Sequence, residues 1–395
     1  MLQELLEPIG CGRGDEEVRC ECGPRMQSKG TRPKTVLTIL GPIRFSRSMF
    51  QCPVCGKPHF PGDEIIDVSG TSRSPGLKRM MARAGSSSTF KQGAQDLKIY
   101  ADIQVSPKDV ERVAEGIGEE VEAWSKQEAE GLLNENRPVP LRREIPVLYV
   151  SYDGTGVPMI PKEVAGQKGK PTDGSAKTRE VKLGCVFTQT TTNKEGYAVR
   201  DPDSTSFVGN IESADEFGYR IYTEALRRGL EFAKEVVILG DGAEWIRGIA
   251  EMHFHGATQI VDLYHAREHV SKLGKMLFGS DEKKNLRFRK QWWKILDSGK
   301  VEKLISQARK HPPPNPEIAK NVETELNYPE KNKERMRYAD FRKRGLFIGS
   351  GVIEAGCKNV IGKRLKQSGM EWSVRGANSI IALRCSTLSN RIDDF

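Results

Sequence analysis

The sequence contains no uninterrupted run of about 18 apolar residues, the length that a helix needs to cross a membrane. Its opening segment, MLQELLEPIGCGRGDEEVRC, also lacks the basic and then apolar stretches of a signal peptide. These two absences predict a cytoplasmic protein. In that compartment the eight cysteines are expected to be free thiols or metal ligands, because disulfides do not persist there.

The chain has fewer acidic than basic residues. The chain of 395 residues has 53 Asp and Glu against 62 Lys and Arg, a net charge of +9. With 37% hydrophobic and 29% charged residues, it has the composition of a folded soluble protein, long enough for two or three domains. The basic excess favours a polyanionic partner, although it is also common in basic proteins with no such partner.

Half of the cysteines form two close pairs. Cys20 and Cys22 lie in CECG, and Cys52 and Cys55 lie in CPVCG. Between the pairs, TVLTILGPIRFSRS has two β-rich runs broken at Gly-Pro, which predicts a hairpin. Two cysteine pairs flanking a hairpin are typical of a structural Zn²⁺ ribbon, here placed in residues 1–66, with Cys11 or His59 as alternative ligands.

A basic, helical segment follows. Residues 71–100 hold six Lys or Arg and one Asp, and helical patterns run through GLKRMMARAG, STFKQGAQDLKIYADI and VSPKDVERVAEGIGEEVEAW. Short helices joined by turns predict a helix-turn-helix-like DNA-binding domain in residues 67–140, with Arg79, Arg83 and Lys91 as DNA contacts. An ordinary helical bundle with a solvated basic face is the alternative.

Three buried strands are each followed by, or end in, an aspartate. IPVLYVSYDG leads to Asp153, EVVILGDG to Asp241 and TQIVDLYH to Asp262. Asp-Gly is a common turn, so the first two could merely end their strands. Ligands, however, gather at the carboxyl ends of strands in open α/β sheets, and clustered carboxylates require a cation, for which Mg²⁺ or Mn²⁺ is suited.

A fourth acid lies in the helical pattern GVIEAGCKNVIGKRLK, which Ser350 could cap. Glu354 lies one position off its apolar stripe, where it can face a groove, and Lys358 is one turn further on. Alternatively, Glu354 is a first-turn acid favoured by the helix dipole. Strand hairpins, then a helix opened by the Ser213–Glu216 capping box, then strand, helix and strand, predict an α/β domain with an RNase H-like fold.

These motifs resemble a known family. YDGTGVPM, VVILGDGAEW, IVDLYHAREH, the segment from GLFIGSGVIEAGCKNV to SVRGAN, and the two cysteine pairs are similar to ISKra-type insertion-sequence transposases of the Mutator-like DDE group. The resemblance implies Asp153, Asp241 and Glu354 as a metal-binding catalytic triad, and Asp262 with His265 as a D-x-x-H signature. It also implies a catalytic domain over residues 141–395, with a helical insertion at about 272–345.

The expected function is then cleavage of transposon ends and joining of the freed 3′-hydroxyl to target DNA by two-metal phosphodiester transfer. The partners would be terminal inverted repeats and target DNA, bound by a nucleoid-associated homo-oligomer. Basic residues near the end of the chain are expected to contact phosphates, and one tryptophan to stack on a base. They are Arg344, Lys358, Arg364, Lys366, Arg375 and Trp372.

Two alternatives stay open. The motif HAREH matches the H-x-x-E-H zinc site of some peptidases, in which His265 and His269 would bind zinc and Glu268 would be the base. That alternative leaves Asp153, Asp241 and the cysteine pairs without a role. The second is a DNA-binding descendant of a transposase that has lost catalysis, because a sequence does not report activity.

Overall fold

The computed structural model describes residues 2–11, 18–134, 144–167, 177–279 and 281–395. They form two compact units, Met1–Gly118 and Glu119–Phe395. The division falls inside helix α5 (Pro107–Leu133) and differs from the boundary predicted near residue 140. Residues 135–143, around that predicted boundary, lie outside the described residues. None of the helices within the described ranges is long and apolar enough to span a membrane.

The first unit begins with helix α1 (Leu2–Cys11) and the predicted hairpin. Strand β1 (Gln27–Thr38) pairs antiparallel with β2 (Gly41–Gln51), which in turn pairs with the short β3 (Pro58–His59). Gly41 begins β2 with a φ of 103°, a value that a residue with a side chain rarely adopts. Helix α2 (Pro61–Ile65) follows.

Three helices complete this unit. Ser74 caps α3 (Pro75–Ser87), Thr89 caps α4 (Phe90–Ala101), and α5 follows. Their apolar sides form one core, made of Leu77, Met81, Ala94, Leu97, Ile103 and Val110. Helices α3 and α4 pack closely, since a Cβ added to Gly93 would lie 3.2 Å from the Ala84 side chain. The three predicted helices are therefore confirmed.

The second unit is built on a five-stranded mixed sheet in the order β10-β9-β4-β5-β8. Strand β4 (Ile145–Pro158) is antiparallel to β5 (Thr178–Gln189), and β5 is antiparallel to β8 (Ser206–Asn210). Strands β9 (Ala233–Gly240) and β10 (Thr258–Val261) run parallel to β4.

Strand β4 corrects one expectation. The sequence predicted that this strand ends at Asp153. Instead β4 continues to Pro158, because its second half pairs with β5 from Asp153 opposite Leu183 to Pro158 opposite Thr178. Asp153 therefore lies within a strand, at the position where pairing with β9 has already ended.

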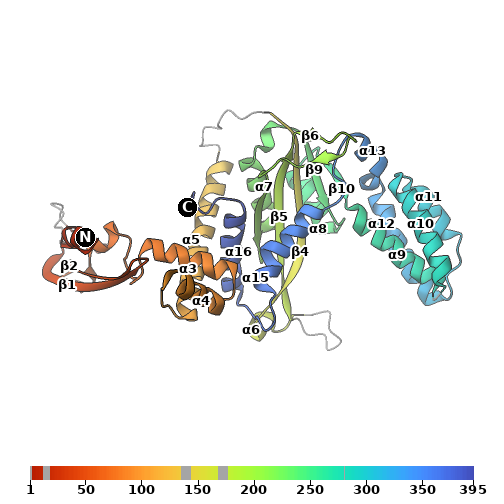
Figure 1. Cartoon of the computed structure of the whole chain (residues 1–395). Coiled ribbons are helices and arrows are strands. Elements are labelled where there is room, and N and C mark those ends of the chain that lie inside the picture. The colour runs from red at the N-terminus through yellow and green to blue at the C-terminus, as the bar shows by residue number, and fades with distance from the viewer. Residues whose placement is uncertain (1, 12–17, 135–143, 168–176, 280) are drawn as a thin grey trace. The chain divides into compact units, whose positions relative to one another are not determined.

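Helices cover both faces of this sheet (Figure 1). Helices α7 (Ala214–Arg227) and α8 (Glu244–His253) pack on one face, around Leu148, Tyr152 and Ile238. The predicted capping box of Ser213 and Glu216 begins α7. The other face carries α14 (Gly351–Gly356), the π-helical turn η3 (Cys357–Gly362), α15 (Lys363–Leu365) and α16 (Val374–Leu388). Small elements join these: α6 (Pro161–Val164), β6 (Thr191–Thr192), β7 (Ala198–Val199) and η1 (Leu230–Phe232).

Helices alone make up the described part of the predicted insertion (Figure 1). They are α9 (Leu263–Phe278), α10 (Glu282–Asp297), α11 (Val301–Arg309), α12 (Pro316–Asn332), η2 (Lys333–Met336) and α13 (Tyr338–Lys343). Helix α9 packs against both α10 and α12, so these helices form a bundle. The bundle starts directly from the end of β10.

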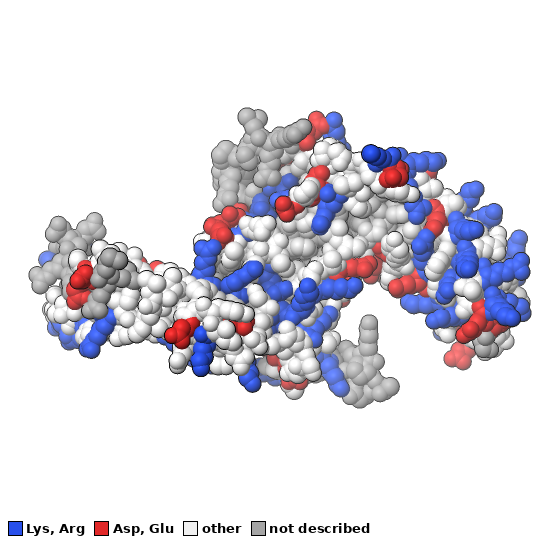
Figure 2. Space-filling view, in the orientation of Figure 1, with Lys and Arg blue, Asp and Glu red and all other residues white. Residues whose placement is uncertain are grey.

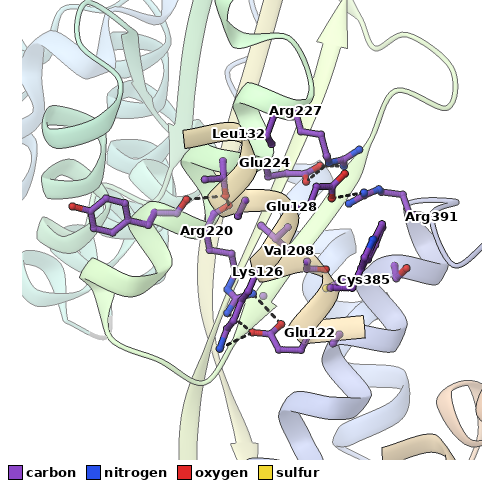
Figure 3. A pocket seen from close by; sticks show the side chains of 18 of the residues that line it. Glu122, Lys126, Glu128, Leu132, Val208, Arg220, Glu224, Arg227, Cys385 and Arg391 are labelled. Atoms are coloured by element: carbon purple, nitrogen blue, oxygen red, sulfur yellow. Dashed lines mark hydrogen bonds and ion pairs between the residues drawn. The ribbon is translucent and has the colours of Figure 1, made fainter. Parts of the chain in front are cut away.

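The second half of α5 explains the position of the unit boundary. It packs beside β8, α7 and α16 around a cavity of about 360 Å³ (Figure 3). Arg220 binds Glu122 of α5 at 2.8 Å, and Arg391 binds Glu128. The arginines that line this cavity thus bind carboxylates, and these ion pairs hold residues 119–133 of α5 within the second unit.

Candidate metal centre and nucleic-acid interface

The four predicted cysteine ligands lie together in the first unit. The Sγ atoms of Cys20, Cys22, Cys52 and Cys55 all lie within 4.8 Å of one another. The closest pairs are 3.5 Å apart, from Cys20 to Cys55 and from Cys22 to Cys52. Thiolates on a tetrahedral Zn²⁺ with Zn–S bonds of about 2.3 Å are separated by about 3.8 Å, so the cluster could hold such a metal.

Hydrogen bonds shift the pKa values of these thiols in both directions. The backbone N–H of Cys55 points at Sγ of Cys52 at 3.5 Å and is the largest cause that lowers the pKa of Cys52 to about 6. Hydrogen bonds with Cys20 and Cys52 raise the pKa of Cys22, and the pKa of Cys55 is also raised. His59, the alternative ligand, instead has its Nδ1 atom 3.4 Å from Glu64. The side chain of Cys11, the other alternative, lies outside the described residues.

In the second unit, all five predicted catalytic residues line one pocket of about 600 Å³. Three parallel strands supply its floor: Asp153 lies on β4, Asp241 directly follows β9, and Asp262 directly follows β10. The backbone N–H of Asp262 donates to the carbonyl of Gly240 at 2.7 Å, which keeps the last two strand ends in register. Glu354 reaches the pocket from α14, and His265 from α9.

Without a cation nearby, the electrostatics of this pocket disfavour the ionised form of Asp153. Burial raises the pKa of Asp153, and the charges of Asp241 and Glu354 raise it further. The N–H of Gly154, which donates to Oδ1 at 2.7 Å, and the charge of His265 act in the opposite direction. A cation between the carboxylates would remove the repulsion, as expected for a metal centre.

Asp262 is almost fully buried, with 1% of its surface exposed. One carboxylate oxygen accepts the backbone N–H of His265 at 2.6 Å and thereby caps α9. The other accepts the backbone N–H of Ser350, which precedes α14. A single side chain therefore joins the helix that carries His265 to the helix that carries Glu354.

Helix α14 departs from the predicted capping. Ser350 occupies the N-cap position without a side-chain cap bond, because its hydroxyl lies 3.2 Å from Oε1 of Glu354. The helix then continues into the π-helical turn that begins with Cys357, whose Sγ lies 3.9 Å from Oδ2 of Asp153. A π-turn widens the helix by one residue per turn and is frequent at functional sites. Here it places a thiol next to a pocket carboxylate.

A second layer of side chains from the insertion supports His265. Its Nε2 atom lies 3.3 Å from Nε2 of His269, and Nδ1 of His269 lies 2.6 Å from a carboxylate oxygen of Glu325 on α12. The ring of Tyr328, also on α12, stacks on His269 at 3.8 Å, and its hydroxyl donates to the backbone carbonyl of Asp241. Burial lowers the pKa of His269, which favours a neutral ring that donates to Glu325 and accepts from His265.

This arrangement gives the zinc-peptidase alternative little support. His265 and His269 do face each other, but no acid or cysteine completes a compact three-ligand group with them among the described residues. His269 is held by Glu325 through its other nitrogen. Glu268, the would-be base, is largely exposed, with its Oε2 atom 3.9 Å from Nδ1 of His265.

Most of the predicted DNA contacts are exposed. Arg79 and Arg83 lie one turn apart on α3, and Lys91 lies on α4. In the second unit the exposed ones are Arg344, Lys358, Lys366 and Arg375. Three of these already have a protein partner: Arg344 binds Glu235, Arg375 binds Glu119, and Lys366 donates to Thr155. Lys358 follows Glu354 by one turn and faces solvent.

Two predicted DNA contacts are corrected by the structure. Arg364 has 0% and Trp372 6% of its surface exposed, and the guanidinium of Arg364 lies over the indole ring at 4.9 Å from its centre. The indole N–H of Trp372 donates to the carbonyl of Leu365 at 3.1 Å. The two side chains hold α15 against the start of α16, so they are not available to a nucleic acid.

The fold and the pocket define a mixed α/β protein with a pocket lined by carboxylates from three neighbouring parallel strands and a helix. The chain belongs to the uncharacterised protein family UPF0236, whose model matches residues 16–391. A search of the curated proteins finds no match. Among solved structures, the chain is similar to the Drosophila P element transposase strand transfer complex, with 9% identity, 84% of each chain covered and a TM-score of 0.27. So distant a likeness carries no argument about function.

Proposed function

We propose that the protein is a DDE-type DNA transposase, which cleaves transposon ends and joins the freed 3′-hydroxyl to target DNA. The observation that carries the proposal is the convergence of Asp153, Asp241 and Glu354 in one pocket, from a strand, a strand end and a helix distant in sequence. The strand order, with β4, β5 and β8 antiparallel and β9 and β10 parallel to β4, supports an RNase H-like fold for this unit.

The donor set fits hard divalent cations. Carboxylate oxygens suit Mg²⁺ or Mn²⁺, and Mg²⁺ is commonly bound by one or two carboxylates together with water and substrate phosphate. Two such ions would supply activation of the attacking hydroxyl and stabilisation of the leaving oxygen. The pocket carboxylates are not a compact preformed group, since among the described residues only the four cysteines form one. This wider spacing of the carboxylates suits metal ions that are also bound by water and substrate phosphate.

The protein's own residues have distinct roles in this proposal. Asp153 and Asp241 bind the metals, and Glu354, oriented by Ser350, completes the site. Asp262 positions α9 and α14 through two backbone N–H groups and has no direct part in the chemistry. His265, held by His269, would contact the scissile phosphate.

Glu325 offers a specific test of the positioning by α12. We expect Glu325→Gln to lower the cleavage rate while DNA binding is retained, because an amide no longer fixes the hydrogen-bonding direction of His269 and His265. Glu323→Gln is the matched control, since Glu323 lies on the same helix and is paired with Arg309. Equal rates for the two variants would contradict the positioning role.

The function itself is tested with labelled duplexes carrying the DNA that flanks the gene on either side, incubated with Mg²⁺ or Mn²⁺. We expect nicking at a defined end by the wild type, and its loss in Asp153→Asn, Asp241→Asn and Glu354→Gln with binding retained. Glu268→Gln, from the same pocket, is the control that keeps activity. Binding without nicking by the wild type would instead establish a catalytically silent DNA-binding protein. No nicking by the wild type, together with peptide hydrolysis that Glu268→Gln abolishes, would establish the peptidase.

A further inference from the structure

The basic charge of the protein is concentrated in the insertion. Residues 272–311 hold twelve Lys or Arg and four Asp or Glu, a formal charge of +8 within a chain whose total is +9. Figure 2 shows Lys and Arg gathered over the region that Figure 1 labels α10 and α11. None of the basic residues that the sequence predicts as DNA contacts lies in this stretch.

Helix α10 arranges part of this charge in a stripe. Lys283, Arg287, Lys290 and Lys294 are all exposed and recur at intervals of four, three and four residues. At about 100° per residue, these intervals place all four within about 60° of one another around the helix axis. We call these four side chains the α10 stripe.

The opposite side of the helix is the packed one. Trp292 and Leu296 are buried, with 0% and 1% of their surfaces exposed, and they lie about 180° from the α10 stripe. Trp292 packs against Phe288 and Phe278, which join α10 to α9. The bundle therefore fixes α10 with the α10 stripe directed at solvent.

The α10 stripe also differs from several arginines of the helical bundle, which have acidic partners. Arg267 binds Asp297, Arg309 binds Glu323, and Arg337 binds Glu302. For the four side chains of the stripe, there is no ion pair with any acid in the part of the chain that the structure describes. A solvated surface normally mixes both signs of charge, whereas an uncompensated row of one sign attracts a polyanion.

We infer that the α10 stripe is a DNA-backbone binding surface, which contacts the phosphates of duplex DNA without reading its sequence. The inference deepens the proposed function and rests on it for the choice of DNA as the polyanion. The stripe is about 16 Å long, close to the rise of five base-pair steps of about 3.4 Å. Lys and Arg on a rigid helix can therefore meet several successive phosphates. Such contacts hold DNA on the unit that contains the carboxylate pocket. They do not depend on the DNA sequence.

The test is the salt dependence of binding to an unrelated duplex, in the full-length protein without divalent metal. The variant R287Q/K290Q/K294Q removes three of the four charges at exposed positions. Each lost phosphate contact reduces the slope of log K against log salt by about 0.9, so the slope should fall by about 2.7. When the salt rises from 50 to 200 mM, the affinity of the wild type for DNA should therefore fall by a factor about 40 times larger than the affinity of the variant.

The control K194Q/K234Q/K320Q removes the same charge from exposed lysines elsewhere in the second unit. Its slope should stay within about 0.5 of the wild-type slope. An equal reduction in both variants would overturn the inference, because it would reflect net charge alone. An unchanged slope in the α10 variant would overturn it in favour of another partner, such as an acidic protein.

Failure of this inference is distinguishable from failure of the proposed function. Binding to an unrelated duplex requires neither metal nor the triad, so a protein that binds through the α10 stripe but never cleaves refutes only the catalytic proposal. A protein that cleaves with an unchanged salt slope in the variant refutes only the α10 surface. A wild type with no affinity for duplex DNA refutes both.

Discussion

The substitution Asp262→Asn tests how one buried side chain holds the pocket together. Asparagine can still accept the N–H of His265 and remains a good helix cap. The second oxygen, however, becomes an amide NH₂ that faces the N–H of Ser350, which leaves a buried donor without an acceptor. An unsatisfied buried group of this kind costs about 1–3 kcal/mol. We therefore expect Asp262→Asn to lower the free energy of unfolding of the second unit by about 1–3 kcal/mol.

The matched control is Asp281→Asn. Asp281 caps α10 in the same way, through the N–H of Lys284 at 3.0 Å, but it is exposed. Because asparagine caps about as well as aspartate, this variant should change the unfolding free energy by less than about 0.5 kcal/mol.

Urea unfolding followed by tryptophan fluorescence measures the second unit selectively. All five tryptophans lie in residues 119–395: they are Trp124, Trp245, Trp292, Trp293 and Trp372. The midpoint and slope of that transition give the free energy. Equal stability of Asp262→Asn and Asp281→Asn would refute the reasoning, since it would show that the contact with Ser350 contributes nothing.

Three further predictions concern the metal sites and the helix that carries Glu354. Because burial and neighbouring carboxylates raise the pKa of Asp153, the metal-free folded protein binds this proton more tightly than the unfolded chain, and its stability falls as the pH rises through that range. At neutral pH, Mg²⁺ should therefore raise the unfolding temperature of the wild type more than that of Asp153→Asn, and equal shifts would contradict a metal site there. Gly356→Ala should cost about 1–3 kcal/mol and reduce cleavage, because the new Cβ would lie 2.8 Å from Phe207, whereas Gly351→Ala on the same helix meets no atom within 4 Å and should be tolerated. Zinc analysis should find about one Zn²⁺ per chain in the wild type and none in Cys52→Ser, with the tryptophan transition unchanged; equal zinc contents would contradict the cysteine site.

Local patterns predicted the elements of the fold well. The apolar runs before Asp241 and Asp262 gave the parallel strands β9 and β10, and Ser213 with Glu216 gave the start of α7. The extent of β4 was missed, because nothing local distinguishes a strand that ends at Asp-Gly from one that continues under pairing with β5. The contacts of the second half of α5 have no local signal either, since they are ion pairs with distant residues such as Arg220.

The site was only partly accessible from the sequence. Residue type and the apolar run before each aspartate were enough to select Asp153, Asp241 and Asp262 as a set. The sequence does not show that Asp262 accepts two backbone N–H groups. These contacts depend on where α14 begins, and no local sequence signal determines that position. Glu325 and Tyr328 carry no motif, and only the packing of α12 on α9 brings them to His269. Lys358 is exposed and Arg364 is buried, although both belong to one basic helical pattern in the sequence.

The most direct test of the account is the binding of Mn²⁺ to the pocket itself. Electron paramagnetic resonance can count free Mn²⁺ in the presence of zinc-loaded wild type and of Asp241→Asn. The account predicts saturable loss of the free Mn²⁺ signal with the wild type and a much weaker loss with the variant, because Asp241 is one of the three pocket carboxylates proposed to bind the metal. Equal binding by the two proteins, or none by the wild type, would contradict the claim that these carboxylates form a divalent-metal centre.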